Sequence, residues 1–216
     1  MELPQTLHGQ LYLLAYDHNR HRFDIYNHSL FGFALRAAML TDLYLTNYLE
    51  DKGGKPHPSS SAGPGDPVLR VAFERVGAST LEDWADLIAE GPKQASRVVR
   101  DQLQATGWLC MQRPPILGFI PARFALYDED MVSGLSDRVT YALHNAINGL
   151  HADPRPLAVG MLGVLGQMPT VLSFKESSRY RQELREMTLA AIEPILGLHH
   201  AIHTFLEDQR ISTFGD

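Results

Sequence analysis

The segment from Leu30 to Leu40 (LFGFALRAAML) constrains the fold most, because Arg36 is the only polar residue in it. A helix on a protein surface carries an apolar stripe on one side only, so a helix that is apolar all round is expected to be surrounded by other helices. Asn27 or Ser29 can cap its start by accepting hydrogen bonds from the first backbone amides. We therefore predict an all-α fold organised around this helix.

Arg36 raises the question of which group neutralises its charge. A guanidinium stays charged at any working pH, so a buried one needs an anion or an opening to water. Asp42 is six residues further on and lies on a different face of the helix. Two interpretations remain open. Arg36 pairs with a buried carboxylate or with the carbonyl groups at the end of a helix, or it lies at the mouth of the bundle and binds a phosphate through its planar donors.

The composition is that of an ordinary globular chain. With 216 residues, 44% hydrophobic and 20% charged, residues 1–216 are expected to form one domain. The net charge of −6 argues against broad binding to nucleic acid. Cys110 is the only cysteine, so no internal disulfide can form, and its apolar surroundings predict a core position. Without a basic leader or an apolar run of roughly 18–20 residues, a cytoplasmic protein, at most peripheral to a membrane, is expected.

The rest of the chain is predicted to be mostly helical. A capping box at Ser79–Glu82 is expected to begin one helix, and three glycines from Gly160 to Gly166 should let a second buried helix pack closely. Helical periodicity predicts helices at Leu7–Tyr16, Val68–Val76, Lys93–Thr106, Val132–Asn148, Leu157–Met168, Lys175–Ala191 and Ile195–Glu207. The fold class is thus a compact bundle of buried central helices wrapped by amphipathic ones.

Two segments break the helical pattern. Residues 51–67 are rich in Gly, Pro and Ser and are predicted to form an exposed loop. Residues 108–127 have two apolar runs on either side of a proline pair and no helical period, which favours a projecting β-hairpin.

The order of these features resembles the Golgi phosphoprotein 3 family. The similar segments are LYLLAYD at 11–17, LRAAMLTDLYL at 35–45, PGDPVLRVAFERV at 64–76, TLEDWADLI at 80–88, LQATGWL at 103–109 and DPRPLAVGMLGVLG at 153–166. The resemblance implies a mostly helical, peripheral membrane protein that binds phosphatidylinositol 4-phosphate. It also implies a phosphate pocket made by a Trp, an Arg on the central helix and an Arg-x-x-Arg pair.

Carried over to this sequence, the central-helix Arg corresponds to Arg36 and the Trp position to Asn27, beside Tyr26. The Arg pair corresponds to Arg97 and Arg100 if a gap of one helical turn is allowed. The alternative for these two residues is a solvated helix face with an Arg97–Asp101 ion pair, which is worth only a few tenths of a kcal/mol.

The predicted hairpin carries apolar residues at Ile116, Leu117, Phe119 and Ile120. They can enter a membrane, contact a second subunit or fold back on the core, and the resemblance implies the first two. His199 and His203 have a spacing that can bind metal, but no zinc-type partners accompany them, so surface histidines are favoured.

No nucleophile or acid–base arrangement stands out, and no cofactor is expected. The leading hypothesis is a non-catalytic protein that binds an anionic phospholipid, with homo-oligomerisation through the hairpin. The alternative is a cytoplasmic helical scaffold for protein partners that does not bind lipid.

Overall fold

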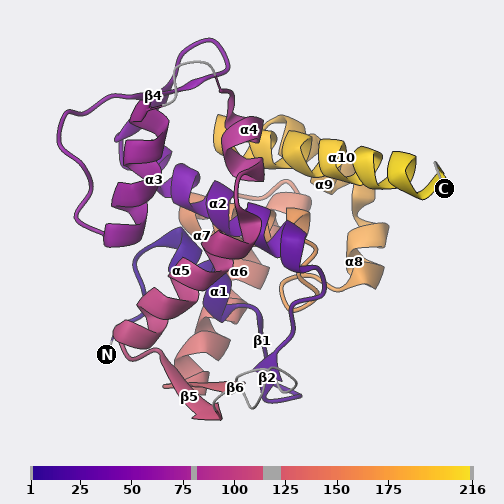
Figure 1. The fold of residues 1–216 in the computed structure, drawn as a ribbon. Coiled ribbons are helices and arrows are strands. Elements are labelled where there is room, and N and C mark those ends of the chain that lie inside the picture. Colours follow the sequence, from indigo (N-terminus) through magenta and orange to yellow (C-terminus); the bar gives the residue numbers. More distant parts are fainter. Residues whose placement is uncertain (1, 79–81, 114–122, 215–216) are drawn as a thin grey trace.

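A computed structural model describes residues 2–78, 82–113 and 123–214. Helix α2 (His28–Leu45) runs through the middle of the molecule (Figure 1). Between Leu30 and Leu43, Arg36 is the only residue that is not buried, so the prediction of a central helix enclosed by others is confirmed. The helices packed against α2 are α1 (Leu7–Leu13), α3 (Pro67–Ala78), α4 (Trp84–Ala89), α5 (Pro92–Ala105), α7 (Pro154–Leu165) and α10 (Glu193–Phe214).

Asn27 caps α2. Its side-chain oxygen accepts hydrogen bonds from the backbone amides of Ser29 and Leu30, at 3.0 and 3.1 Å. This satisfies donors that the first turn of a helix leaves unpaired. The structure thus decides between the two predicted caps and assigns Asn27 a structural role.

Helix α7 packs closely against its neighbours at the predicted glycines. A Cβ atom added at Gly160 would lie 2.6 Å from a side-chain atom of Leu143, which belongs to α6 (Glu129–Ile147). One added at Gly166 would lie 2.8 Å from Cβ of Ala34 in α2. Glycine therefore sets the distance between α7 and both of these helices.

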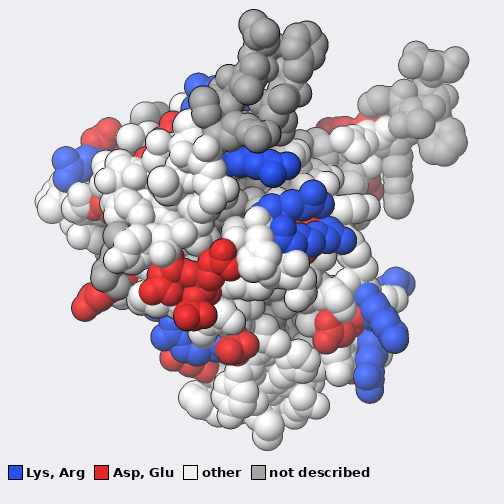
Figure 2. Space-filling model, turned by 90° about the horizontal axis from the view of Figure 1, so that it is seen from below, with Lys and Arg blue, Asp and Glu red and all other residues white. Residues whose placement is uncertain are grey.

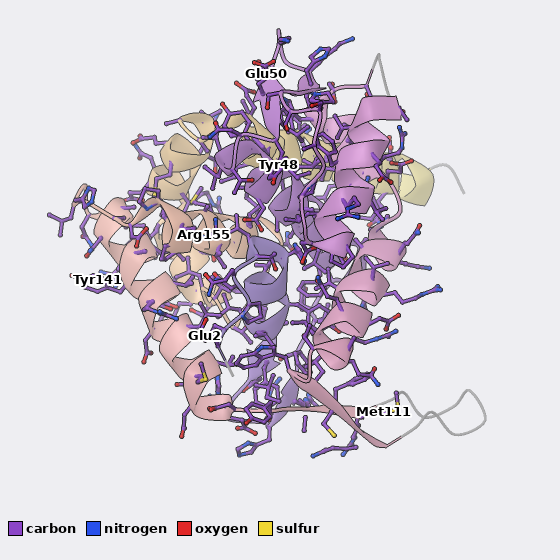
Figure 3. The ribbon with its side chains drawn as sticks, turned by 90° about the vertical axis from the view of Figure 1, so that its left-hand side faces the viewer. Glu2, Tyr48, Glu50, Met111, Tyr141 and Arg155 are labelled. Carbon is purple, nitrogen blue, oxygen red and sulfur yellow. The ribbon has the colours of Figure 1, made fainter. Side chains whose placement is uncertain are left out.

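Arg155, near the start of α7, forms hydrogen bonds to two other segments of the chain. Its side chain, labelled in Figure 3, donates to the backbone carbonyl of Gln5 and to the buried carboxylate of Asp42, the latter at 2.8 Å. Asp42 also accepts the backbone N–H of Leu7, at the start of α1. As expected from its position, Asp42 is not the partner of Arg36.

The helix predicted at Lys175–Ala191 is wrong as a single element. The chain forms α8 (Phe174–Arg179) and α9 (Arg181–Leu189), because Tyr180 leaves the helical region with φ −100° and ψ 25°. Helix α9 buries Leu184 and Thr188 and packs against α6 and α10, whereas α8 buries none of its residues. The break lets the chain change direction between an exposed and a packed helix.

In the described part of the chain, three antiparallel pairs of strands connect the helices. Strands β5 and β6 confirm the predicted hairpin at 108–127, while the apolar residues Ile116, Leu117, Phe119 and Ile120 lie outside the described residues. A second pair lies partly within the predicted loop at 51–67. The pairs are β1 (Tyr16–Asp17) with β2 (Arg22–Phe23), β3 (Leu49–Asp51) with β4 (Pro56–Pro58), and β5 (Leu109–Arg113) with β6 (Arg123–Leu126).

Three local predictions are wrong. Cys110 is exposed, because successive side chains of a strand alternate and Leu109 takes the inner face of β5. Helix α4 begins at Trp84 with Asp83 as its cap, so the capping box is formed by Asp83 and Asp86. Helix α1 ends at Leu13, since Tyr16 belongs to β1.

Candidate anion-binding site

Arg36 has two acceptors from the end of α4. Its Nε and Nη2 atoms donate to the backbone carbonyl of Leu87 at 3.2 and 3.0 Å, and Nη2 also donates to a carboxylate oxygen of Glu90 at 3.1 Å. The last carbonyl groups of a helix have no partner within it, so this one is available to the guanidinium. Both contacts correspond to the structural interpretation of Arg36, but its side chain keeps 15% of its surface exposed.

Glu90 is shared by two arginines. Its carboxylate accepts from Nε of Arg75 at 3.0 and 3.1 Å, while Nη2 of Arg75 donates to Glu82 at 2.9 Å. The four side chains form an alternating row of charges in which Glu90 is 45% exposed. Burial lowers the pKa of Arg36 and the charge of Glu90 opposes this effect, whereas hydrogen bonds to Glu82 and Glu90 raise the pKa of Arg75.

The row of charges borders a cavity of about 350 Å³ between α2, α3 and α5. Arg36, Arg75, Glu90 and Gln94 supply its polar groups. Its apolar walls come from Met39, Pro67, Val68, Val71, Ala72, Ala95 and Val98. A cavity lined by both guanidinium groups and aliphatic side chains is suited to an amphiphile whose polar end is an anion.

Neither Arg97 nor Arg100 lines this cavity. Arg97 is exposed and has no ion pair among the residues that the structure describes. Arg100 pairs with Asp101 at 2.7 Å and lies over the ring of Phe124, 5.6 Å from its centre. The Arg97–Asp101 pair of the alternative interpretation is therefore absent from this structure.

The stripe of α5 that faces the cavity explains this arrangement. Gln94, Ala95 and Val98 lie on one side of the helix, and Arg97 and Arg100 lie on another. Val98 is 37% exposed at the cavity rather than part of the buried face, which Ala95, Val99 and Leu103 form.

Arg75 and Glu90 were not identified from the sequence. Each lies in an amphipathic segment whose polar residues read as a solvated face, and Glu90 is 54 residues from Arg36. An ion pair over that separation leaves no periodic signal in the sequence. Tyr26, predicted beside Arg36, instead lines a different cavity together with Phe174.

The two hairpins β1–β2 and β5–β6 lie at one end of the molecule, where β2 contacts β6. Arg22 and Arg123, one on each hairpin, have exposed side chains. Figure 2 views this end and shows Lys and Arg side chains gathered across the middle of the face, with a separate group of Asp and Glu side chains beside them. This end of the molecule therefore offers basic groups outside the cavity.

The prediction that the histidines near the C-terminus lie at the surface is confirmed only in part. His200 and His203 are exposed, whereas His199 is half-buried, and burial lowers its pKa. Within the described ranges, no group of three or more His, Cys, Asp or Glu side chains is placed to hold a metal ion. None of the described helices has the length and apolar character needed to cross a membrane.

Comparison with known protein families places the described cavity inside a matched region. Residues 7–197 match the sequence model of the family described as Golgi phosphoprotein 3 (GPP34). The matched range begins with α1, ends inside α10 and includes every residue that lines the Arg36 cavity. A search of curated proteins finds no match.

Proposed function

Since the chain belongs to the Golgi phosphoprotein 3 family, we propose that it is a peripheral membrane protein that binds the phosphorylated headgroup of an anionic phospholipid without catalysis. Phosphatidylinositol 4-phosphate or a related lipid is the ligand that the resemblance implies. The observation that carries the proposal is the position of Arg36: the one incompletely buried residue in the middle of α2 borders an open cavity with apolar walls.

Glu90 holds the place that a phosphate would take. Arg36 and Arg75 both donate to this carboxylate, so a phosphate between them would accept hydrogen bonds from two guanidinium groups. Glu90 accepts charged hydrogen bonds from the same two guanidinium groups, so a phosphate gains affinity only by what it offers beyond a carboxylate. A phosphate monoester carries up to two negative charges and more acceptor oxygens, and Glu90 is half-exposed and can turn to water when it is displaced.

A second contact is needed for stable residence on a membrane, because one weak anchor gives only marginal and reversible binding. The basic side chains at the end that carries β1–β2 and β5–β6 suit an anionic membrane surface, to which each contributes about 1 kcal/mol. The apolar residues Ile116, Leu117, Phe119 and Ile120 remain predicted contacts with lipid or with a second subunit. In this proposal the protein is cytoplasmic and associates with the membrane through both contacts.

The test measures co-sedimentation with phosphatidylcholine vesicles that contain or lack phosphatidylinositol 4-phosphate. Arg36→Ala is expected to reduce binding to the phosphoinositide vesicles about tenfold, because one charged donor pair is lost. Glu90→Gln is expected to strengthen binding, since it removes the competing carboxylate. Thermal unfolding of both variants establishes that the fold is intact.

Glu50→Gln is the matched control for Glu90→Gln. Glu50 pairs with Lys52 near the start of the β3–β4 hairpin, so its substitution changes the net charge equally but leaves the cavity unaltered. Equal strengthening by both variants would assign the effect to overall charge. Unchanged binding by folded Arg36→Ala would remove Arg36 from the site, and binding indifferent to lipid charge would favour the scaffold alternative.

A further inference from the structure

A second cavity, of about 470 Å³, lies where the chain entering α2 meets the end of α7 and helices α8 and α9. It shares no lining residue with the Arg36 cavity. Its wall includes Tyr26, Phe174, Gln167, Ser177 and Arg181. Volumes of this size are typical of sites for small molecules, which combine an apolar lining with a few polar groups.

Two aromatic side chains form the rim of this cavity. The rings of Tyr26 and Phe174 meet edge to face with centres 4.8 Å apart, yet the two residues are 64% and 50% exposed. Leu172 and Leu184, both buried, lie below them in the lining. Large apolar side chains left open to water beside an apolar floor mark a surface that gains free energy when a ligand covers it.

Three polar side chains of the cavity have no side-chain partner among the described residues, and the exposed Arg181 is open to water or to a ligand. Arg181 is the only charged residue in the lining, and the structure gives it no ion pair with any described residue. Gln167 and Ser177 likewise have no side-chain hydrogen bond in the described part of the chain.

Gln167 is an unexpected residue for its backbone conformation. It follows the C-cap of α7 with φ 54°, a left-handed conformation in which glycine is preferred and other residues are strained by about 1–2 kcal/mol. Its side-chain amide, which glycine would not provide, lines the cavity. Strained residues of this kind gather at binding sites.

We propose that this cavity binds a soluble, small organic anion in which an apolar ring carries a phosphate or a carboxylate. Arg181 donates two hydrogen bonds to the oxyanion, and the Gln167 amide and the Ser177 hydroxyl donate to its remaining oxygens. The ring lies between the aromatic rim and the leucine floor. This site is independent of the lipid-binding function proposed above.

Nuclear magnetic resonance titration of the full chain with phenyl phosphate tests the proposal. Backbone amides of α8 and the start of α9 are expected to shift, with much weaker responses to inorganic phosphate, which lacks the ring, and to phenol, which lacks the charge. Benzoate in place of phenyl phosphate distinguishes a carboxylate ligand from a phosphate ligand. Arg181→Gln and Phe174→Ala are each expected to weaken the binding of phenyl phosphate about tenfold.

Arg185→Gln is the matched control, because Arg185 is one turn further along α9 and does not line the cavity. It is expected to leave the affinity for phenyl phosphate within about twofold. Equal responses to phenyl phosphate and inorganic phosphate, or equal affinities of Arg181→Gln and Arg185→Gln, would overturn the proposal. Binding of Arg181→Gln to phosphoinositide vesicles is expected to match that of the unaltered protein, which separates this site from Arg36.

Discussion

Substitution of alanine for Gly32 tests the contact that holds α5 against α2. A Cβ atom at this position would lie 2.3 Å from the carbonyl oxygen and 2.5 Å from Cβ of Pro92, the first residue of α5. At Gly134, in the exposed part of α6, the corresponding position has no atom within 4 Å apart from its chain neighbours and the backbone of its own helix. The same substitution at the two sites therefore meets a backbone obstacle in one case and open space in the other.

The two substitutions share every effect except the steric one. Both replace a glycine within a helix, and alanine at such a position is favoured by about 1 kcal/mol through helix propensity and the entropy of the unfolded chain. Gly134→Ala is therefore expected to be more stable than the unaltered protein by about 1 kcal/mol. At Gly32 the neighbouring atoms must move by about 1 Å to reach ordinary contact, since such contacts begin at 3.4 Å.

Overpacking of a core costs about 1–3 kcal/mol, and the upper end applies here because the obstacle is backbone. We expect Gly32→Ala to be less stable than Gly134→Ala by about 3 kcal/mol, and less stable than the unaltered protein by about 2 kcal/mol. Urea denaturation followed by circular dichroism measures both differences. Equal stability of the two variants would refute the described contact between α2 and α5.

Two further predictions concern buried ionisable groups. His8 is buried and bonded to Gln102 at 2.9 Å, and burial lowers its pKa from 6.5, so the unfolded chain takes up a proton that the folded chain does not. The contribution of neutral His8 to the free energy of unfolding should be fully present above about pH 6.5, and below that pH the free energy should fall by up to about 1.4 kcal/mol per pH unit. Urea denaturation at several pH values measures this slope, and His8→Gln should reduce it. Arg155→Met should cost about 2 kcal/mol at pH 7, because Asp42 keeps a buried charge while the lost guanidinium was partly exposed. Burial raises the pKa of Asp42, so the destabilisation by Arg155→Met should become smaller in acid, where Asp42 takes up a proton. Adding Asp42→Asn to the Arg155→Met variant should restore part of the lost stability. A destabilisation independent of pH would contradict the pairing of Arg155 with a buried carboxylate.

The sequence predicted the features that follow from local pattern. An apolar run without a polar face located α2, and the proline pair and the loss of helical period located the hairpin. The break at Tyr180 has no glycine or proline to announce it, and it arises because α9 packs against α6. The exposure of Cys110 depends on strand register, in which a shift of one residue reverses the outcome.

The candidate site was predicted only in part, because most of it depends on contacts between segments far apart in the sequence. Arg36 could be identified because a charge inside an apolar run requires a partner. Its neighbours could not, since Arg75 and Glu90 reach it only when α3 and the end of α4 are placed beside α2. Arg97 and Arg100 were carried over from the family resemblance with a gap of one helical turn, and their Arg-x-x-Arg spacing does not specify the face of α5 that meets the cavity.

The energetics of Arg36 connect the fold to the proposed function. Replacement of a buried ion pair by apolar residues of similar volume is often neutral or stabilising, so packing alone gives no reason for an arginine in the middle of α2. The contacts of Arg36 with Leu87 and Glu90 offset its desolvation, but Glu90 remains half-exposed and is shared with Arg75. In the proposed function, a phosphate that enters the cavity takes the place of this half-exposed carboxylate, so the contact that completes the folded protein is also the one that the ligand exchanges.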